Sequence, residues 1–129
     1  MKLEPLLYVS DLSRSIQFYR DLLGLRIGVL FPNEKDPTYA PVFIGESKLM
    51  LCLARDSNWQ LHKDGLGGSG LQLFIQVEDV DELLDRIEER VNVVESIETK
   101  PWGDREFSFS DPDNYLITFY TPIVNLAKV

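Results

Sequence analysis

Side chains that could carry covalent chemistry are scarce in this chain of 129 residues, which has a single histidine, His62, and a single cysteine, Cys52. His62 lies in a polar, glycine-rich segment. Without serine and carboxylate partners that can be placed beside it, it is better interpreted as a solvated loop residue than as part of a catalytic triad. Cys52 lies in an apolar run, where we expect it to pack beneath a helix as an unreactive thiol. Catalytic residues are therefore unknown at this point.

The stretch WGDREFSFSDPDNYLITF (102–119) offers chemistry of another kind, that of non-covalent binding. Trp102 either stacks on a planar ligand or packs against the hairpin that follows it. Neighbouring side chains on a strand point to opposite faces, so only one of Arg105 and Glu106 can face a ligand. The sequence leaves open which of the two it is.

These residues need a scaffold, and the hydrophobic pattern predicts one that occurs twice. Asp11 and Asp79, 68 residues apart, each provide a helix N-cap followed by apolar residues at helical spacing: Leu12, Ile16, Tyr19 and Leu23, then Val80, Leu84, Ile87 and Val91. Strands are predicted at 3–10, 25–31, 71–78 and 91–98. Hairpins are predicted at 42–54, turning at 45–47, and at 105–121, turning at DPDN. Each half is thus strand–helix–strand–strand–strand.

The repeat predicts one domain of the α+β class over residues 1–129. We expect module one at 1–55, a linker at 56–70, module two at 71–122 and a C-terminal tail at 123–129. A half of about 60 residues has too little core to stand alone. We therefore expect the two βαβββ modules to be related by an approximate two-fold, with a cupped mixed sheet and helices on its outer face. The segment GLGGSG (65–70) matches a dinucleotide-binding pattern but precedes a strand, which indicates a flexible joint.

Alternation along the predicted strands selects the side chains of the cup. In strand 71–78 the aliphatic set should pack on a helix, so the cup should receive Gln72, Phe74, Gln76 and Glu78. The repeat places Glu4, Leu6, Tyr8 and Ser10 on the same side. The two hairpins match at an offset of 67, which pairs Leu51 with Thr118 and Leu53 with Tyr120. By the same alternation Leu51 and Leu53 lie on one face of their strand, and Thr118 and Tyr120 lie on one face of theirs.

At this point the chain resembles the glyoxalase/bleomycin-resistance/dioxygenase superfamily, also called vicinal oxygen chelate proteins. The resemblance covers nearly the whole chain and is carried by VSDLSRSIQFYRDLLGL (9–25), VEDVDELLDRI (77–87) and the stretch 102–119. It implies the paired βαβββ fold. The superfamily includes isomerases, lyases, ring-cleaving dioxygenases and non-catalytic drug binders, so the resemblance alone does not select an activity.

Catalytic members of the superfamily hold one divalent metal through His or Gln on the first strand of each module and carboxylates on the last. The resemblance places these positions at Glu4, Gln72, Leu51 and Thr118. Leu51 offers no donor and Thr118 only a neutral hydroxyl, so we expect no metal and no other cofactor. Glu4 and Gln72 then either contact a ligand or hydrogen-bond each other and buried water.

Composition adds further bounds. No run approaches the roughly 18 consecutive apolar residues of a membrane span. The N-terminus lacks a signal-peptide layout, and a lone cysteine excludes an internal disulfide. We therefore expect a cytoplasmic protein without a membrane partner. The net charge of −8 and the pI of about 4.6 argue against nucleic acid as a partner. They favour a cationic ligand, although solubility is the simpler explanation of the charge.

The function predicted from the sequence is a metal-free, homodimeric small-molecule binding protein similar to bleomycin-resistance proteins, with a cationic, partly aromatic drug as the expected ligand. The residues expected to bind it are Glu4, Leu51, Gln72, Phe74, Trp102, Thr118 and Tyr120. The alternative is a metal-dependent lyase, isomerase or dioxygenase of the same superfamily. A third possibility, a structural or partner-binding module, would have a cup filled by side chains.

Overall fold

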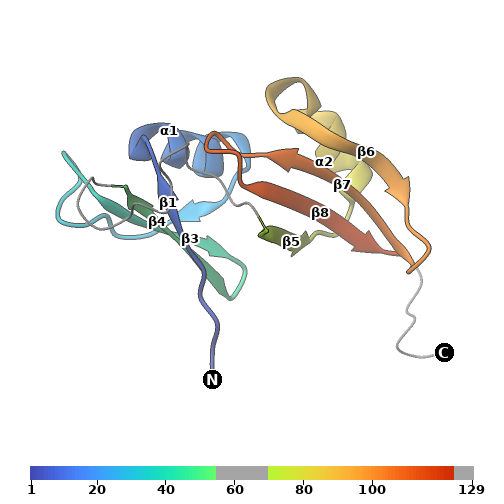
Figure 1. Cartoon of the computed structure of the whole chain (residues 1–129), viewed down its shortest axis with the longest axis horizontal. Helices are drawn as coiled ribbons and strands as arrows, with labels where there is room; N and C mark the ends of the chain where they lie inside the picture. The colour runs from blue at the N-terminus through green and yellow to red at the C-terminus, as the bar shows by residue number, and fades with distance from the viewer. Residues whose placement is uncertain (55–69, 124–129) are drawn as a thin grey trace. The chain divides into compact units, whose positions relative to one another are not determined.

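The computed structural model describes residues 1–54 and 70–123 (Figure 1). The chain splits into two compact units, Met1–Gly67 and Gly68–Val129, and each contains one of the predicted modules. The predicted linker except Gly70, and with it His62 and most of the GLGGSG segment, lies outside the described residues. The single-domain boundaries and the two-fold relation stay predictions.

Module one begins with β1 (Leu6–Val9), followed by α1 (Leu12–Ile16), which continues as the π-helical turn η1 (Gln17–Leu22). Three strands follow: β2 (Arg26–Ile27), β3 (Tyr39–Ile44) and β4 (Ser47–Leu53). Their sheet has the order β1-β4-β3-β2, with β1 parallel to β4 and the other pairs antiparallel. The helix begins as predicted, because the Asp11 carboxylate accepts the backbone N–H of Arg14 at 3.1 Å.

Module two repeats this plan with β5 (Gln72–Gln76), α2 (Val80–Ile87), a 3-10 turn (Glu88–Arg90), β6 (Asn92–Thr99), β7 (Asp104–Ser110) and β8 (Leu116–Pro122). Its sheet has the order β5-β8-β7-β6, again with one parallel pair, between β5 and β8. Asp79 caps α2 by accepting the backbone N–H of Glu82 at 3.1 Å. The predicted α+β class with two βαβββ modules is confirmed.

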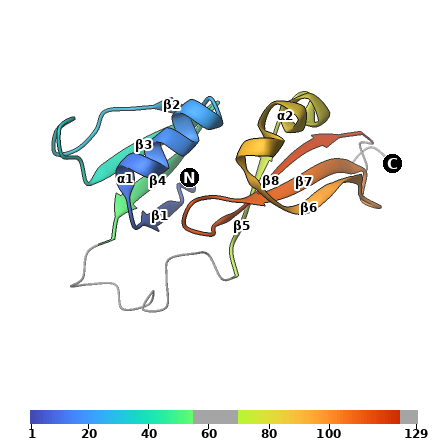
Figure 2. The ribbon, with the colours of Figure 1, turned by 90° about the horizontal axis from the view of Figure 1, so that it is seen from above.

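In each module a helix runs along one face of the sheet (Figure 2). In module two α2 contacts β7 and β8, and these strands bury three phenylalanines, Phe107, Phe109 and Phe119, whose ring centroids lie 5.2–6.0 Å apart. Side chains alternate along the strands, so the opposite face carries a different set. We call it the open face of module two; its members are Gln72, Phe74, Gln76, Glu106, Ser108, Thr118 and Tyr120.

The register of the first hairpin corrects the prediction for Leu51. Leu51 is fully buried and pairs with Leu7 and Ala40, which are also buried on the helix side. It therefore lies in the core of module one, away from the open side of the sheet. In module two Thr118 pairs with Phe74, and the repeat places Leu6 at the position of Phe74. Leu6 pairs with Met50, so Met50 is the residue of module one that corresponds to Thr118.

The prediction that Cys52 packs beneath a helix is wrong for the same reason. Cys52 is partly exposed and pairs with Tyr8 and Tyr39 on the face opposite the buried residues. The error arose at the turns: two residues separate Ile44 from Ser47, whereas five separate Ser110 from Leu116. Matching the turns directly shifts the strands by one residue, and such a shift exchanges the two faces.

None of the helices within the described residues is long and apolar enough to span a membrane.

Candidate binding face of module two

A hydrogen-bonded polar row crosses the open face of module two from β5 to β7. The side-chain amide of Gln72 donates to Thr118 Oγ1 at 2.6 Å, and Thr118 Oγ1 shares a hydrogen with Ser108 Oγ at 2.7 Å. Thr118 and Ser108 are buried, so these bonds satisfy hydroxyls that water does not reach. The amide of Gln72 thus has its partner within its own module.

Aromatic rings lie beside this row. Phe74 and Tyr120 meet edge to face with centroids 6.1 Å apart, and Phe74 is half exposed. The Tyr120 hydroxyl donates to Gln76 Oε1 at 3.4 Å, which connects β8 with β5. The predicted positions of Gln72, Phe74, Thr118 and Tyr120 on one face of the sheet match the strand register.

The structure resolves the choice between Arg105 and Glu106. Arg105 turns towards α2, where its guanidinium donates to both carboxylate oxygens of Asp81 at 2.8 and 2.9 Å. These hydrogen bonds lower the pKa of Asp81 and raise the pKa of Arg105. Glu106 pairs with Tyr120 and lies on the open face.

Glu106 is the most unusual ionisable residue of this face. It is only 4% exposed, and its Oε2 has no hydrogen-bond partner. Burial raises the pKa of its carboxyl, and the nearby carboxylates of Asp104 and Glu95 act in the same direction. A hydrogen bond from the Trp102 indole and the charge of Lys100 oppose this rise in pKa.

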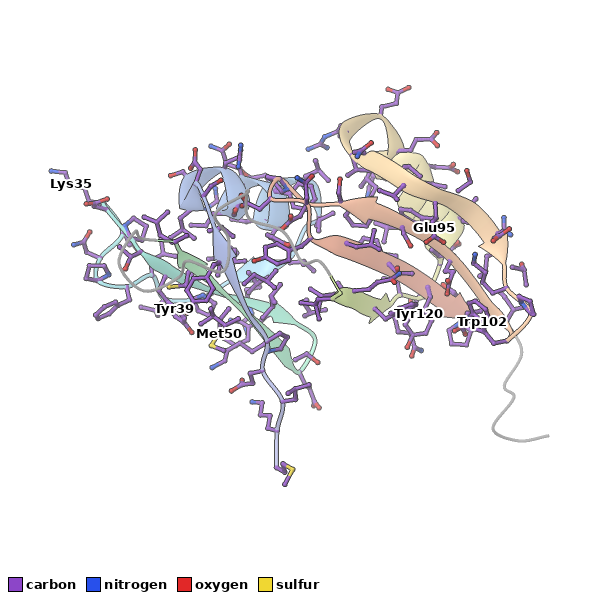
Figure 3. All side chains as sticks on the ribbon, in the orientation of Figure 1. Lys35, Tyr39, Met50, Glu95, Trp102 and Tyr120 are labelled. Carbon is purple, nitrogen blue, oxygen red and sulfur yellow. The ribbon has the colours of Figure 1, made fainter. Side chains whose placement is uncertain are left out.

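Glu106 belongs to a cluster that we call the acidic corner, consisting of Glu95, Glu98, Lys100, Trp102 and Glu106. Lys100 is hydrogen-bonded to Glu98, and its Nζ lies 3.6 Å from Glu95 Oε2, contacts that raise the pKa of Lys100. The same Nζ lies 5.8 Å from the centre of the half-exposed Trp102 ring. Figure 3 labels Glu95, Trp102 and Tyr120 on module two. One ammonium group is thus shared by three carboxylates.

Sequence reasoning missed Glu95, Glu98 and Lys100. Glu95 pairs with Ser108 and Glu98 pairs with Glu106, so both lie on the open face although they are an odd number of positions, three, apart in the sequence. Simple alternation would put them on opposite faces, but the pairing shifts between them, as it does at a β-bulge. The available signal was the accumulation of glutamates in the segment beside Trp102.

In module one, Glu4 lies before β1, and its Oε2 is 3.4 Å from Lys48 Nζ and 3.5 Å from Lys2 Nζ. Two lysines therefore already compensate its charge. Its predicted role as a ligand contact stays a prediction. Leu51, in the core, has no surface to offer a ligand.

The donors that the resemblance implies do not fit a divalent metal. Glu4 is held by lysines, Gln72 and Thr118 are hydrogen-bonded to each other, and the counterpart of Thr118 is Met50, a soft thioether. Magnesium and manganese prefer carboxylate ligands, and zinc, nickel and iron bind well to imidazole, so this set suits none of them. Among the described residues there is no group of three or more His, Cys, Asp or Glu side chains that could hold a metal ion.

Comparison with known proteins agrees with this fold. The family model described as "Glyoxalase/Bleomycin resistance protein/Dioxygenase superfamily" matches residues 3–119. The chain belongs to this superfamily. Among curated members, it is 35% identical over 122 residues to the uncharacterised protein YraH of Bacillus subtilis, covering 88% of this chain and 92% of that one.

Two further similarities concern proteins whose names state what they do. The chain is 30% identical over 130 residues to a bleomycin resistance protein of Geobacillus stearothermophilus, covering 92% of this chain and 95% of the relative. Among solved structures, TnmS3, an antibiotic binding protein from a Streptomyces species, superposes with a TM-score of 0.71 at 25% identity. That match covers 95% of each chain.

Proposed function

We propose that this protein binds a small molecule without transforming it, and that the ligand is cationic and partly aromatic. The observation that carries the proposal is the open face of module two, where exposed aromatic rings adjoin an acidic corner. The similarity to a bleomycin resistance protein and to an antibiotic binding protein supports the same function.

Two physical terms would hold such a ligand. Stacking of a cation or an electron-poor ring on an aromatic side chain contributes about 0.5–2 kcal/mol, and Trp102 and Phe74 each have roughly half of their surface available. The carboxylates of the acidic corner and the net charge of −8 attract a cation from solution. A flat ligand with a positive charge uses both terms.

A thermal-shift screen followed by titration calorimetry tests the proposal, with bleomycin and planar aromatic amines as probes. We expect stabilisation by these cations and a smaller effect at high salt, since the Debye length falls from about 30 Å at 0.01 M to about 8 Å at 0.15 M. Trp102→Ala should weaken binding, while Phe31→Ala, which removes another exposed aromatic ring, serves as the matched control. Stabilisation by anions or neutral lipids alone, without salt dependence, would contradict the proposal.

The alternative is a metal-dependent lyase, isomerase or dioxygenase, and the donor chemistry described above argues against it. We expect purified protein to carry no stoichiometric zinc, nickel, manganese or iron. Elemental analysis that finds about one metal per chain, lost in Glu4→Ala or Gln72→Ala, would favour the enzyme instead.

We also propose that the protein is a homodimer. Strand β6 is an edge of the module-two sheet and exposes Val93 and Val94, and an uncovered apolar edge is a natural site for association. Sedimentation at low micromolar concentration should give about twice the chain mass of 14.8 kDa. A monomer under these conditions would contradict this proposal and leave the ligand proposal standing.

A further inference from the structure

We propose that Glu106 anchors the ligand by accepting an N–H from a protonated amine or amidine, which supplies the hydrogen bond that its Oε2 lacks in the free protein. The inference rests on the proposed function and names the atom that would recognise the cation. The class of ligand follows from it: a flat aromatic ring that carries its positive charge on an N–H group beside the ring.

The first support is the state of Oε2. It is buried and without a hydrogen-bond partner, although a carboxylate oxygen in such a place normally has one. Strand pairing gives no reason for a carboxylate at this position. Glu106 pairs with Tyr120, whose counterpart in module one is Cys52. Cys52 pairs with Tyr39, so in module one the position of Glu106 is occupied by an uncharged aromatic side chain.

The second support is the balance of charge around Glu106. Glu95 and Glu98 face it from β6, Asp104 precedes it on β7, and Tyr120 and Gln76 adjoin it from β8 and β5. The cation that acts on it is Lys100, which is already bound to Glu98 and lies close to Glu95. A positive charge on the ligand would reduce the excess of negative charge in a group that now holds three carboxylates and one ammonium.

The third support is the position of Trp102. It lies in the connection between β6 and β7, half exposed, and is close enough to Glu106 for its indole to lower the pKa of that carboxyl. This connection is a tight turn in which Gly103 has a φ of +98° and donates to the carbonyl of Lys100 at 3.0 Å. One side chain thus reaches the anchoring carboxylate and offers a ring face, so a ligand that stacks on Trp102 brings its charge next to Glu106.

A matched pair of probes isolates the N–H cation. 9-Aminoacridine is a flat cation near neutral pH, whereas acridine has almost the same ring shape and is neutral there. Binding of both is measured by titration calorimetry to the wild-type chain, to Glu106→Gln and to Glu89→Gln. The last variant removes the same unit of charge from an exposed turn outside the acidic corner.

We expect the wild-type chain to bind 9-aminoacridine more tightly than acridine. Glu106→Gln should weaken 9-aminoacridine about tenfold or more and leave acridine unchanged, because a hydrogen bond to a charged group is lost for the first ligand alone. Glu89→Gln should change neither affinity. Melting curves of the three proteins should show that Glu106→Gln is folded, since it preserves the shape of the side chain.

Other results would overturn the inference in distinguishable ways. If the wild-type chain binds 9-aminoacridine and Glu106→Gln binds it equally well, the anchor is elsewhere and the proposed function survives. If Glu106→Gln weakens both probes alike, Glu106 acts through the shape of the site and not as a cation acceptor. If the wild-type chain binds neither these probes nor bleomycin, the proposed function fails and the anchor fails with it.

The pH dependence of the affinity for 9-aminoacridine is a second measurement, and it would not depend on Glu106 if that residue had only a structural role. Because the pKa of Glu106 is raised, acidification neutralises its carboxyl before the exposed carboxylates of the corner. The affinity for 9-aminoacridine should therefore fall from neutral to mildly acidic pH in the wild-type chain, with a proton released on binding. Glu106→Gln should show a flatter profile, and identical profiles in the two proteins would contradict the inference.

Discussion

The two modules share one chain plan and differ in the sheet face that their helix leaves uncovered. In module one this face is formed mainly by uncharged side chains, with Tyr8, Tyr39, Met50 and Cys52 paired across β1, β3 and β4. In module two the corresponding positions include Thr118, Tyr120 and Glu106, with a row of side-chain hydrogen bonds. A repeated scaffold thus carries two different surfaces.

From this difference we expect module two to recognise the proposed ligand. Buried hydrogen bonds fix side chains in one geometry, and a buried carboxylate without a partner is retained at the expense of stability. Apolar side chains on a sheet face impose no such geometry. Polar specificity should therefore reside in module two.

The largest expected effect tests the strand register of module one. Leu51→Ala should reduce the free energy of unfolding by about 2–5 kcal/mol, because it opens a cavity among fully buried residues. Met50→Ala, one residue away on the other face, should cost less than about 2 kcal/mol because Met50 is only partly buried. Urea unfolding of both variants measures the difference, and the reverse order would show that the sequence-based register was right after all.

This register shows how far the sequence determines the fold. The two N-caps, the helices after them and the order of helix and strands along the chain were predictable, because each is a local pattern. The predicted apolar face of the second helix was only partly right, since α2 buries Leu83 in place of Leu84 and ends before Val91. The turns were recognised too: Asp111 Oδ1 accepts the backbone N–H groups of Asp113 and Tyr115, as expected for DPDN. The number of residues that each turn leaves unpaired was not predictable, and that number decides which face Leu51 occupies.

The next effect in size tests the hydrogen-bonded row of module two. Thr118→Val keeps the shape of the side chain but removes the hydroxyl that receives Gln72 and contacts Ser108. The variant should lose about 1–3 kcal/mol of unfolding free energy, since a buried hydroxyl and an amide lose their partner. Thr99→Val, on a mostly exposed strand, is the matched control and should have little effect. If Thr118→Val were as stable as the wild-type chain, water would have to replace the hydrogen bonds that Thr118 makes with Gln72 and Ser108.

A smaller effect concerns the buried carboxyl. The folded pKa of Glu106 is raised mainly by burial, so between the unfolded and folded pKa values the folded state holds more protons. The contribution of Glu106 to stability is therefore present at acidic pH and lost as pH rises through the folded pKa. Unfolding measured over a pH series should show that Glu106→Gln loses this decline and is the more stable protein at neutral pH. A decline of the same size in both proteins would assign it to other groups.

The candidate site was less predictable than the fold, and Glu106 and its neighbours show why. The positions of Gln72, Phe74, Thr118 and Tyr120 on one face follow from alternation, which is a property of any strand. The acidic corner depends on irregular pairing between β6 and β7 and on the turn that carries Lys100 and Trp102. Burial of Glu106 depends on how these side chains pack together, and no local pattern encodes it.

The smallest expected effect compares the features that the modules share most closely, the N-caps. Asp11 and Asp79 have φ values of −142° and −137°, and each accepts a backbone N–H three residues on at 3.1 Å. Replacing either by Ala should cost about 1 kcal/mol of unfolding free energy, whereas replacement by Asn, which keeps a capping oxygen, should cost much less.

The two costs should nevertheless differ slightly. The first turn of α2 contains Asp81 and Glu82, whose negative charges favour the helix N-terminus, whereas the first turn of α1 has no acidic residue. In Asp79→Ala these acidic side chains still stabilise the N-terminus of α2, whereas α1 has none to do so in Asp11→Ala. Asp79→Ala should therefore be the milder variant by a few tenths of a kcal/mol, about the size of one such charge effect. Urea unfolding in low and high salt separates the charge effect from the capping hydrogen bond. High salt should reduce the difference in stability between the two variants, while each variant still loses the free energy of its cap. A difference that persists in high salt would mean that the two caps are not equivalent, and that the repeat differs even where its backbone geometry agrees.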